Sequence, residues 1–363
     1  MSNPVDERAR QILSTIPDPH SGQDLVTSGA VRGIGVSGAR VSVDIQLGYP
    51  ALSWQADLAA QIKSALEADA SIESASVGVS CRVGAHRVQQ GLTPLPGIRN
   101  VIAVASGKGG VGKSTVSANL ALALRAEGAS VGILDADIYG PSQPRMLGLS
   151  GKPDTKDGNR IEPKVNHGIQ VMSIGFLIDE DTPMIWRGPM VTQALQQLLT
   201  DTNWVDLDYL VIDLPPGTGD IQLTLCQRVP VSGAVIVPTP QDIALLDARR
   251  ALKTFEKVNV PVLGIIENMS THICSSCGHE EHVFGEGGGL RMAAQYGVPM
   301  LGSLPLDIRI REQADGGQPT VVAMPDSDIA ARYREIARNA AARLSLQARN
   351  KAIQFPKIVV ENG

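Results

Sequence analysis

The ten residues SGKGGVGKST (106–115) directly follow the apolar run VIAVA (101–105) and open the helix-forming segment TVSANLALALRAEG (115–128). Residues 107–114, GKGGVGKS, match the pattern GxxxxGK followed by Ser or Thr, whose glycines let successive backbone N–H groups converge on phosphate oxygens. Because this segment stands between an apolar strand and a helix, it predicts a phosphate-binding loop at the edge of a sheet.

Apolar runs of the same kind recur downstream. They are VIAVA (101–105), VGILDAD (131–137), YLVIDLP (209–215), SGAVIVP (232–238) and PVLGIIEN (261–268). Their apolar residues are continuous rather than alternating, which is typical of strands covered on both faces in a parallel sheet. Helical segments separate the runs. The sequence therefore predicts a doubly wound α/β domain with a mostly parallel sheet, of the P-loop NTPase type.

The N-terminal part has a different pattern. VSVDIQL (41–47) alternates as a half-buried strand does, and LAAQIKSAL (58–66) carries one apolar helical stripe. We expect a small α+β domain over residues 1–85, a linker over 86–98 rich in Pro and Gly, the P-loop domain over 99–345 and a C-terminal tail over 346–363. Ile329, Tyr333, Ile336, Ala340 and Leu344 predict a terminal helix that packs on the domain.

Bulk composition excludes several classes of protein. The 363 residues carry 32 Lys and Arg against 37 Asp and Glu, with no basic run that would indicate a nucleic-acid or membrane surface. The N-terminus MSNPVDERARQ lacks the apolar core of a secretory signal, and no stretch approaches a membrane span. We therefore expect a cytoplasmic protein with no membrane or nucleic-acid partner.

The phosphate loop predicts the residues of a nucleotide site. We expect Lys113 to place a point charge on the β and γ phosphates and Ser114 to offer its hydroxyl to Mg²⁺. The remaining residues expected to bind the nucleotide are Gly107, Lys108, Gly109, Gly110, Val111, Gly112 and Thr115. Asp213 ends an apolar strand where a Walker B carboxylate would hold the shell of the metal. Asp135 and Asp137 end another apolar strand. We expect these two carboxylates to serve the shell of the metal and to orient the attacking water.

The second lysine of the loop, Lys108, needs a separate explanation. In the geometry of a phosphate loop its side chain does not easily turn back onto its own nucleotide. If its charge has a function, it acts on a neighbouring molecule.

A pair of cysteines, Cys274 and Cys277, forms a CxxC with His272, His279 and His282 close by. With four cysteines in the chain, a disulfide framework is excluded, and metal or redox chemistry is favoured. Three interpretations remain: a zinc site that includes His279 and His282, a thioredoxin-like pair, or half of an iron-sulfur site. Because a 4Fe-4S cluster takes four thiolates, a dimer with one CxxC per subunit would complete the third. The two-fold axis of such a dimer would also bring Lys108 to the partner subunit.

The segments around these residues resemble a known family. GKGGVGKS is similar to the deviant Walker A loop of the MinD, ParA and nitrogenase iron protein class, which implies that Lys108 crosses a dimer interface to the partner's nucleotide. From about residue 98 onward the chain resembles the Mrp (ApbC) family of iron-sulfur cluster carrier ATPases, with the segments NVIAVASGKGGVGKSTVSANLALAL, GILDADIYGPSQPRMLG, VIDLPPGTGD, VPTPQDIALLDARR and ENMSTHICSSCGHEEHVFGEGGG in family order.

This resemblance implies a set of roles. Residues 107–114 bind ATP, Asp135, Asp137 and Asp213 serve Mg²⁺ and hydrolysis, Asn268 contacts adenine, and Cys274 with Cys277 ligate the cluster. Residues 1 to about 85 resemble the iron-sulfur cluster assembly domain of many bacterial members. Some such domains carry a cysteine after the third strand, but here the stretch is LGYPALSW (47–54), so no cluster chemistry is assigned to it.

We therefore expect a homodimeric, slowly hydrolysing ATPase that binds a 4Fe-4S cluster between its subunits and delivers it to apo iron-sulfur proteins. One alternative is a MinD- or ParA-like positioning ATPase, which would not need the two cysteines. Another is an ATPase whose CxxC holds a structural zinc. Metal analysis separates these hypotheses.

Overall fold

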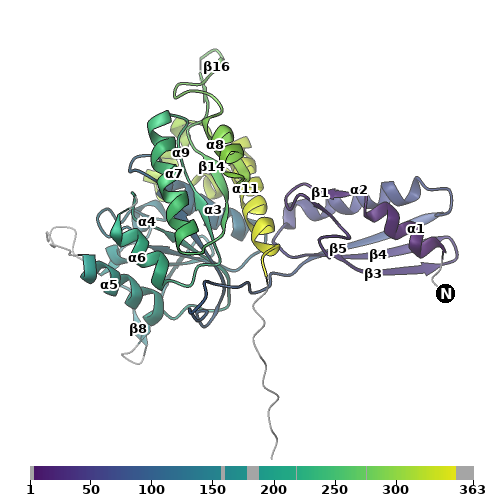
Figure 1. Ribbon diagram of the computed structural model, residues 1–363, viewed down its shortest axis with the longest axis horizontal. Helices are drawn as coiled ribbons and strands as arrows, with labels where there is room; N and C mark the ends of the chain where they lie inside the picture. Colours follow the sequence, from purple (N-terminus) through teal and green to yellow (C-terminus); the bar gives the residue numbers. More distant parts are fainter. Residues whose placement is uncertain (1–3, 157–159, 178–187, 218, 275, 349–363) are drawn as a thin grey trace, which may run out of the picture.

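The structure, a computed structural model, describes residues 4–156, 160–177, 188–217, 219–274 and 276–348. Figure 1 shows two units joined at one side: a small N-terminal unit, and a larger α/β domain from which a hairpin projects. None of the described helices combines the length and the apolar character that a membrane crossing needs.

The larger domain is built on a sheet that has eight strands within the described residues. All neighbouring strands are parallel except the first pair. In spatial order the strands are β10 (Lys164–Asn166), β11 (Ile169–Ser173), β7 (Val131–Asp135), β12 (Leu207–Asp213), β6 (Ile98–Ala105), β13 (Gly233–Ile236), β14 (Val262–Glu267) and β17 (Met300–Ser303). The predicted doubly wound α/β fold is confirmed, and each of the five apolar runs overlaps one of its strands.

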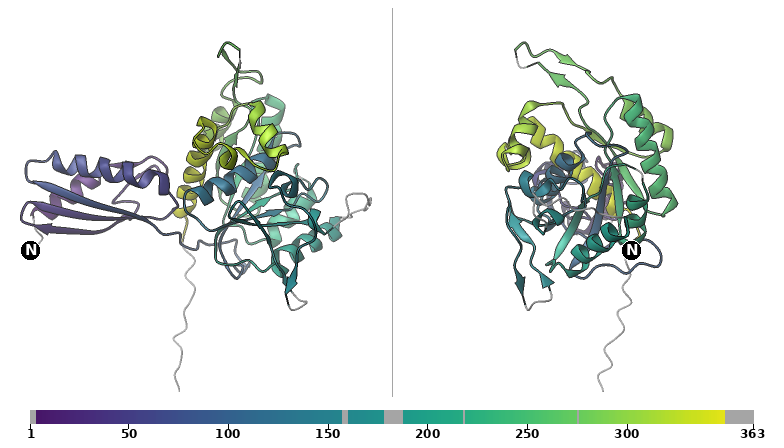
Figure 2. Two further views of the ribbon diagram at one scale, coloured as in Figure 1. Left: turned by 180° about the vertical axis from the view of Figure 1, so that it is seen from behind. Right: turned by 90° about the vertical axis from the view of Figure 1, so that its left-hand side faces the viewer.

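Helices cover both faces of this sheet (Figure 2). The chain leaves β6 toward β7 on one side and later passes from β12 to β13 on the other, so the connections diverge at β6. Ligands of such sheets bind at the carboxyl ends of the strands beside this divergence, where the loop after β6 lies. The helices are α3 (Lys113–Ala126), α4 (Gln143–Met146), α5 (Gly188–Asp201), α6 (Asp220–Arg228), α7 (Asp242–Lys257), α8 (Gly288–Tyr296), α9 (Ile308–Asp315), α10 (Thr320–Ala323) and α11 (Asp328–Ser345).

Short elements complete the larger domain: η2 (Ile174–Phe176), the pair β8 (Thr155–Lys156) with β9 (Arg160–Ile161), and the projecting hairpin of β15 (His272–Ile273) with β16 (Glu280–Glu281). Helix α11 packs on α3, β14 and β17. All five residues of its predicted apolar stripe are buried, so that prediction is confirmed.

The N-terminal unit is a three-stranded sheet covered by two helices on one face. Its elements are α1 (Pro4–Leu13), β1 (Pro17–Asp18), β2 (Gln23–Asp24), β3 (Val31–Ser37), β4 (Arg40–Leu47), η1 (Leu52–Trp54), α2 (Gln55–Glu67) and β5 (Ser74–Cys81). The alternation of β4 buries Val41, Val43, Ile45 and Leu47 beneath α2, as the sequence predicts. Cys81, at the end of β5, is half-buried and accepts a hydrogen bond from the Gln55 amide at 3.2 Å.

A buried carboxylate ties the two units together. Glu127, directly after α3 and only 1% exposed, receives hydrogen bonds from both the backbone and the hydroxyl of Ser53 in the N-terminal unit. Arg338 of α11 donates to the same carboxylate at 2.6 Å and to the Ser53 hydroxyl at 2.9 Å. A buried charge needs such partners, because its desolvation would otherwise destabilise the fold. The C-terminal end of the phosphate-loop helix is therefore a docking point for the N-terminal unit.

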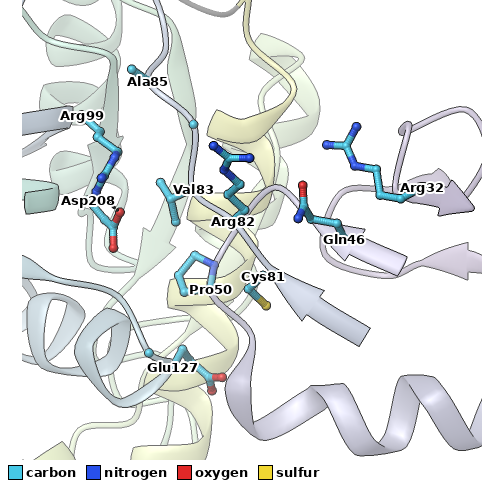
Figure 3. A pocket seen from close by; sticks show the side chains of 12 residues that line it. Arg32, Gln46, Pro50, Cys81, Arg82, Val83, Ala85, Arg99, Glu127 and Asp208 are labelled. Atoms are coloured by element: carbon cyan, nitrogen blue, oxygen red, sulfur yellow. Dashed lines mark hydrogen bonds and ion pairs between the residues drawn. The ribbon is translucent and has the colours of Figure 1, made fainter. Parts of the chain in front are cut away.

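Beside this docking point lies a cavity of about 600 Å³ between the two units. Figure 3 shows Arg32, Gln46 and Cys81 of the N-terminal unit on one side and the ion pair of Arg99 with Asp208 on the other. The predicted linker adjoins it and is attached to the larger domain rather than free. His86 in this segment contacts the Asn100 side chain at 2.9 Å.

His20 is a second contact between the units. Arg338 donates to its Nε2 at 3.2 Å, so its proton lies on Nδ1, which donates to the Asn339 oxygen at 3.0 Å. Burial lowers the pKa of His20; the bond to Asn339 opposes this effect, and the charge of Arg338 adds to it. The native contact therefore favours the neutral ring.

This contact predicts how stability changes with pH. The unfolded state, with an ordinary histidine pKa of about 6.5, binds the proton more readily than the native state, so the contribution of His20 is complete above that pH. The contribution of His20 to stability is lost as the pH falls below about 6.5. We expect the wild-type free energy of unfolding in urea to fall between pH 7 and pH 5 more steeply than that of His20→Gln, whose neutral amide does not titrate. Parallel curves would contradict the assignment.

Parts of the fold were not predicted from the sequence. β11 and β17 were not identified, because their runs are short and interrupted by polar residues, and β10 was missed with its antiparallel turn. Of the predicted tail 346–363, residues 349–363 lie outside the described part of the chain.

Candidate nucleotide and metal sites

The loop between β6 and α3 has the backbone that its glycines predict. Gly110 and Gly112 have φ of 78° and 80°, in the left-handed region that glycine adopts without strain. A Cβ at Gly107 would overlap the backbone of Asp247 in α7, and one at Gly112 would overlap the Asn268 amide. The loop is thus closely enclosed by the segments that follow β13 and β14, and no larger residue fits at these two points.

Lys113, the first residue of α3, points into a buried acidic cluster. Its Nζ lies 2.5 Å from Asp213 Oδ1, 4.0 Å from Asp137 Oδ2 and 3.3 Å from the Ser114 hydroxyl. Asp213, at the end of β12, is fully buried, and Ser117 Oγ donates to its Oδ1 at 2.9 Å. The lysine neutralises the carboxylate that is expected to serve the metal.

The two other acids follow β7. Asp135 is fully buried and accepts hydrogen bonds from the Ser173 hydroxyl and from the backbone N–H groups of Asp137 and Gln143. Burial, together with the negative charge of Asp213, raises the pKa of Asp135 to about 7. Burial also raises the pKa of Asp137, against the opposing charge of Lys113. Asp135 therefore binds a proton more readily than an ordinary carboxylate, which limits the repulsion within the cluster.

A cavity of about 210 Å³ lies over the loop. The loop residues from Ser106 to Thr115, apart from Gly107, line it together with Asp137, Ser142, Met146 and Pro216. Its backbone donors, the Lys113 ammonium and the open glycine positions fit a polyphosphate, and the Ser114 hydroxyl with the Asp213 carboxylate are oxygen ligands of the kind Mg²⁺ prefers. The hydroxyl of Ser142 is buried here without a partner among the described residues.

Lys108 lines the same cavity and is half-buried. No carboxylate in the described part of the chain lies within ion-pairing distance of its ammonium group, in contrast to Lys113. The structure therefore leaves its charge available to a ligand or to another molecule.

Asn268, directly after β14, supports the loop. Its amide donates to the carbonyl of Val111 at 2.8 Å, and its backbone N–H donates to Pro238. Only six positions later the chain reaches Cys274, so a single short segment joins the phosphate loop to the cysteine pair.

The cysteine pair lies at the tip of the hairpin that projects from the domain in Figure 1. Cys274 is half-buried and Cys277 is exposed, and neither forms a disulfide. The tight turn is held by hydrogen bonds from the Cys274 N–H to the His279 carbonyl and from the Gly278 N–H to the Cys274 carbonyl. The backbone N–H groups of Ser276 and Cys277 and the Cys277 thiol lower the pKa of Cys274, which favours the thiolate that binds metals.

Two of the three histidines near this pair contact backbone carbonyls. Nδ1 of His272 contacts the Leu306 carbonyl, and Nδ1 of His282 contacts the Ser270 carbonyl, at 3.1 and 3.0 Å. Among the described residues, no three His, Cys, Asp or Glu side chains are grouped so that they could hold a metal ion. The pair also lies in a hairpin rather than at the start of a helix, where a thioredoxin-like pair is expected.

Two residues of the nucleotide site were missed in the sequence. Ser117 stands four positions after Lys113, so helical spacing alone places both on one face of α3 and could have identified it. Gln143 also contacts Asp213, but nothing in its local sequence distinguishes it from a surface helix residue. Its contacts depend on the loop after β7 returning to the sheet edge.

Comparison with protein-family models gives two matches. Residues 97–341 match the family of NUBPL iron-transfer P-loop NTPases, and residues 6–79 match the iron-sulfur cluster assembly protein family. Among curated proteins, the iron-sulfur cluster carrier protein of Pseudomonas fragi is 61% identical over 268 residues, 73% of this chain and 93% of the relative. That of Haemophilus influenzae is 48% identical over 341 residues, 94% and 92% of the two chains.

Solved structures share the fold of the larger domain. A nucleotide-binding protein from Archaeoglobus fulgidus in complex with ADP is 39% identical, with a TM-score of 0.55, over 64% of this chain and 91% of that one. The cell division ATPase MinD of Pyrococcus furiosus, at 23% identity and a TM-score of 0.50, covers 66% of this chain and 97% of its own and shows likeness of fold alone.

Proposed function

Because the chain belongs to the NUBPL family of iron-transfer P-loop NTPases, we propose that it is an ATP-hydrolysing carrier of iron-sulfur clusters. Two copies would hold one 4Fe-4S cluster between them and transfer it to apo iron-sulfur proteins. The names of its curated relatives describe the carriage or transfer of iron-sulfur clusters.

The observation that carries the proposal is the pair of half-buried Cys274 and exposed Cys277 on a projecting hairpin. Within the described residues the pair has no third ligand, so one chain offers two thiolates where a 4Fe-4S cluster takes four. A second copy, related by a two-fold axis, supplies the missing two. Two thiolates per chain on a projecting hairpin fit a cluster that is later released. A structural metal, in contrast, is held in a site whose ligand positions are all filled by the protein.

The surface around the site supports a dimer through this edge of the sheet. Large apolar side chains are exposed in segments that follow four parallel strands: Tyr139 after β7, Ile243 after β13, Ile273 after β14 and Ile308 after β17. Apolar side chains gathered at one edge of a domain favour an interface there. The unpaired Lys108 lies at the same edge, where it would reach the nucleotide of the partner subunit.

The residues of the nucleotide site have separable tasks in this proposal. Binding of ATP draws the ammonium of Lys113 from Asp213 to the phosphates, since both are anionic partners of the same group. Mg²⁺, held by Ser114 and by Asp213 through water, would supply charge neutralisation of the phosphates. Asp137 orients the attacking water, and the partner's Lys108 stabilises the charge that develops on the transferred phosphoryl group.

In this proposal, Asn268 links the nucleotide site to the cysteine hairpin. Its amide holds the loop at Val111 and its backbone begins the segment that ends in Cys274. A shift of the loop on nucleotide binding therefore moves the base of the hairpin, so that ATP acts as a switch on cluster retention. We further propose that Asn268 borders the adenine, that residues 1–85 form a separate partner-docking domain, and that the protein acts in the cytoplasm, where thiols stay reduced.

An anaerobic transfer assay tests this function. The protein is reconstituted with iron and sulfide, separated from free iron, and incubated with an apoenzyme that needs a 4Fe-4S cluster, with and without Mg·ATP. We expect recovery of the apoenzyme's activity faster than with equal free iron and sulfide, and a change in rate with ATP. Recovery no faster than with the free ions, or a protein that retains only zinc, would contradict the proposal and favour a structural zinc site.

A further inference from the structure

Gln143, the first residue of α4, joins three parts of the nucleotide site. Its side-chain amide nitrogen donates to the Ser114 carbonyl at 2.9 Å and to Asp213 Oδ2 at 3.0 Å, and its backbone N–H donates to Asp135 at 3.1 Å. The side chain is fully buried. Both side-chain partners are acceptors, so the amide orientation is fixed: the flipped form would place an oxygen against two oxygens.

The two carboxylate oxygens of Asp213 accept hydrogen bonds from different donors. Lys113 and Ser117 contact Oδ1, whereas Gln143 contacts Oδ2. When Lys113 turns to bound phosphate, Ser117 and Gln143 remain as the donors that hold the carboxylate. Without Gln143, Oδ2 would have no donor among the described residues, and the carboxylate would be held through Oδ1 alone.

Gln143 also has an unused acceptor. Its Oε1 is buried without a hydrogen-bond partner among the described residues, and so is the hydroxyl of its neighbour Ser142, which lines the cavity over the loop. A buried acceptor without a donor is costly, and two unpartnered oxygens on adjacent residues, one of which lines the cavity, indicate that a bound group with hydrogens completes the site. Water molecules around a divalent cation are donors only, and they match an unpartnered amide oxygen.

We infer that Gln143 is a positioning residue for the magnesium and nucleotide site: its amide fixes Asp213 in the orientation that receives the hydrated cation, and its oxygen accepts a hydrogen bond from that hydration shell. This inference rests on the proposed nucleotide function. It adds to the nucleotide site a residue that belongs neither to the phosphate loop nor to the strand-end carboxylates. Gln143 acts through Asp213 and the cation's water, not on the phosphate itself.

Magnesium dependence of nucleotide binding tests the role without reliance on hydrolysis. Binding of a fluorescent, non-hydrolysable ATP analogue is measured in EDTA and then during titration with Mg²⁺, for wild type, Gln143→Leu and the control Gln295→Leu, which removes an exposed glutamine of α8. For Gln143→Leu we expect affinity in EDTA within about twofold of wild type, and about tenfold more Mg²⁺ for the half-maximal effect, as for loss of a hydrogen bond to a charged group. Gln295→Leu should match wild type.

Gln143→Asn keeps the amide but is one methylene shorter, so it cannot span Ser114 and Asp213 and should shift the Mg²⁺ dependence in the same direction. The asparagine variant provides the test if the leucine variant does not fold. An unchanged Mg²⁺ requirement in both variants overturns the inference, and so does an equal loss of affinity in EDTA and in Mg²⁺, which marks a purely structural residue. If the wild type itself binds no nucleotide, the proposed function fails as well.

Discussion

Replacing Lys108 with alanine should lower ATP hydrolysis by roughly 10³-fold, the low end of the effect of a charge supplied across an interface, while it changes ATP affinity little. The physical reason is that Lys108 has no ion-pair partner among the described residues and lines the cavity. Lys113, in contrast, occupies the buried cluster. Steady-state hydrolysis and equilibrium binding of a fluorescent ATP analogue measure the two quantities. Lys152→Ala, which removes an exposed lysine outside the site, is the matched control.

A mixture of two inactive variants tests whether the lysine acts on the partner. Lys108→Ala keeps Asp137, and Asp137→Asn keeps Lys108, so a mixed dimer contains one site with both groups only if Lys108 crosses the interface. An equal mixture should then recover about a quarter of wild-type activity, because half of the dimers are mixed and each has one complete site. No recovery, from a mixture shown to exchange subunits, would mean that Lys108 acts within its own chain or not at all.

Replacing Cys274 and Cys277 together with alanine should abolish iron and sulfide binding and leave ATP binding within about twofold of wild type. The thiolates are the cluster's only protein ligands in the proposal, and the nucleotide site makes no direct contact with either sulfur in the described structure. Iron and acid-labile sulfide analysis after anaerobic reconstitution, with the visible absorption of the cluster, measures the loss.

Cys81→Ala is the matched control for this experiment. Its thiol is half-buried in the N-terminal unit and burial raises its pKa, so it is a poor metal ligand and the variant should retain the full iron content. Full iron content in the Cys274→Ala, Cys277→Ala double variant would contradict the ligand assignment. Zinc in the wild type that iron never displaces would indicate a structural site.

Much of the fold follows from local sequence. The strands on either side of β6 are continuous apolar runs, and residues 107–114 match the phosphate-loop pattern between a strand and a helix, so the parallel sheet and its phosphate loop could be predicted. The stripe of α11 was equally clear because its period is regular over several turns. Strands such as β17, with the sequence MLGS, carry no such pattern and exist only because β14 offers an edge to pair with.

The electrostatics of the site could be predicted only in part. That Asp213 would lie near Lys113 follows from the strand-end rule, but its direct pairing with the ammonium group at 2.5 Å does not. Gln143 and the docking carboxylate Glu127 depend on contacts between segments far apart in the chain, about 70 residues for each side-chain bond. Sequence spacing carries no information about such contacts until the topology is known.

The central claim is that two chains share one cluster, and the mass of the cluster-loaded particle tests it most directly. After anaerobic reconstitution, native mass spectrometry should find a particle of two chains with about four iron and four sulfide ions, reverting toward single chains when the cluster is chelated. A single chain that carries a complete cluster, or a dimer in which each chain holds its own metal, would contradict the account.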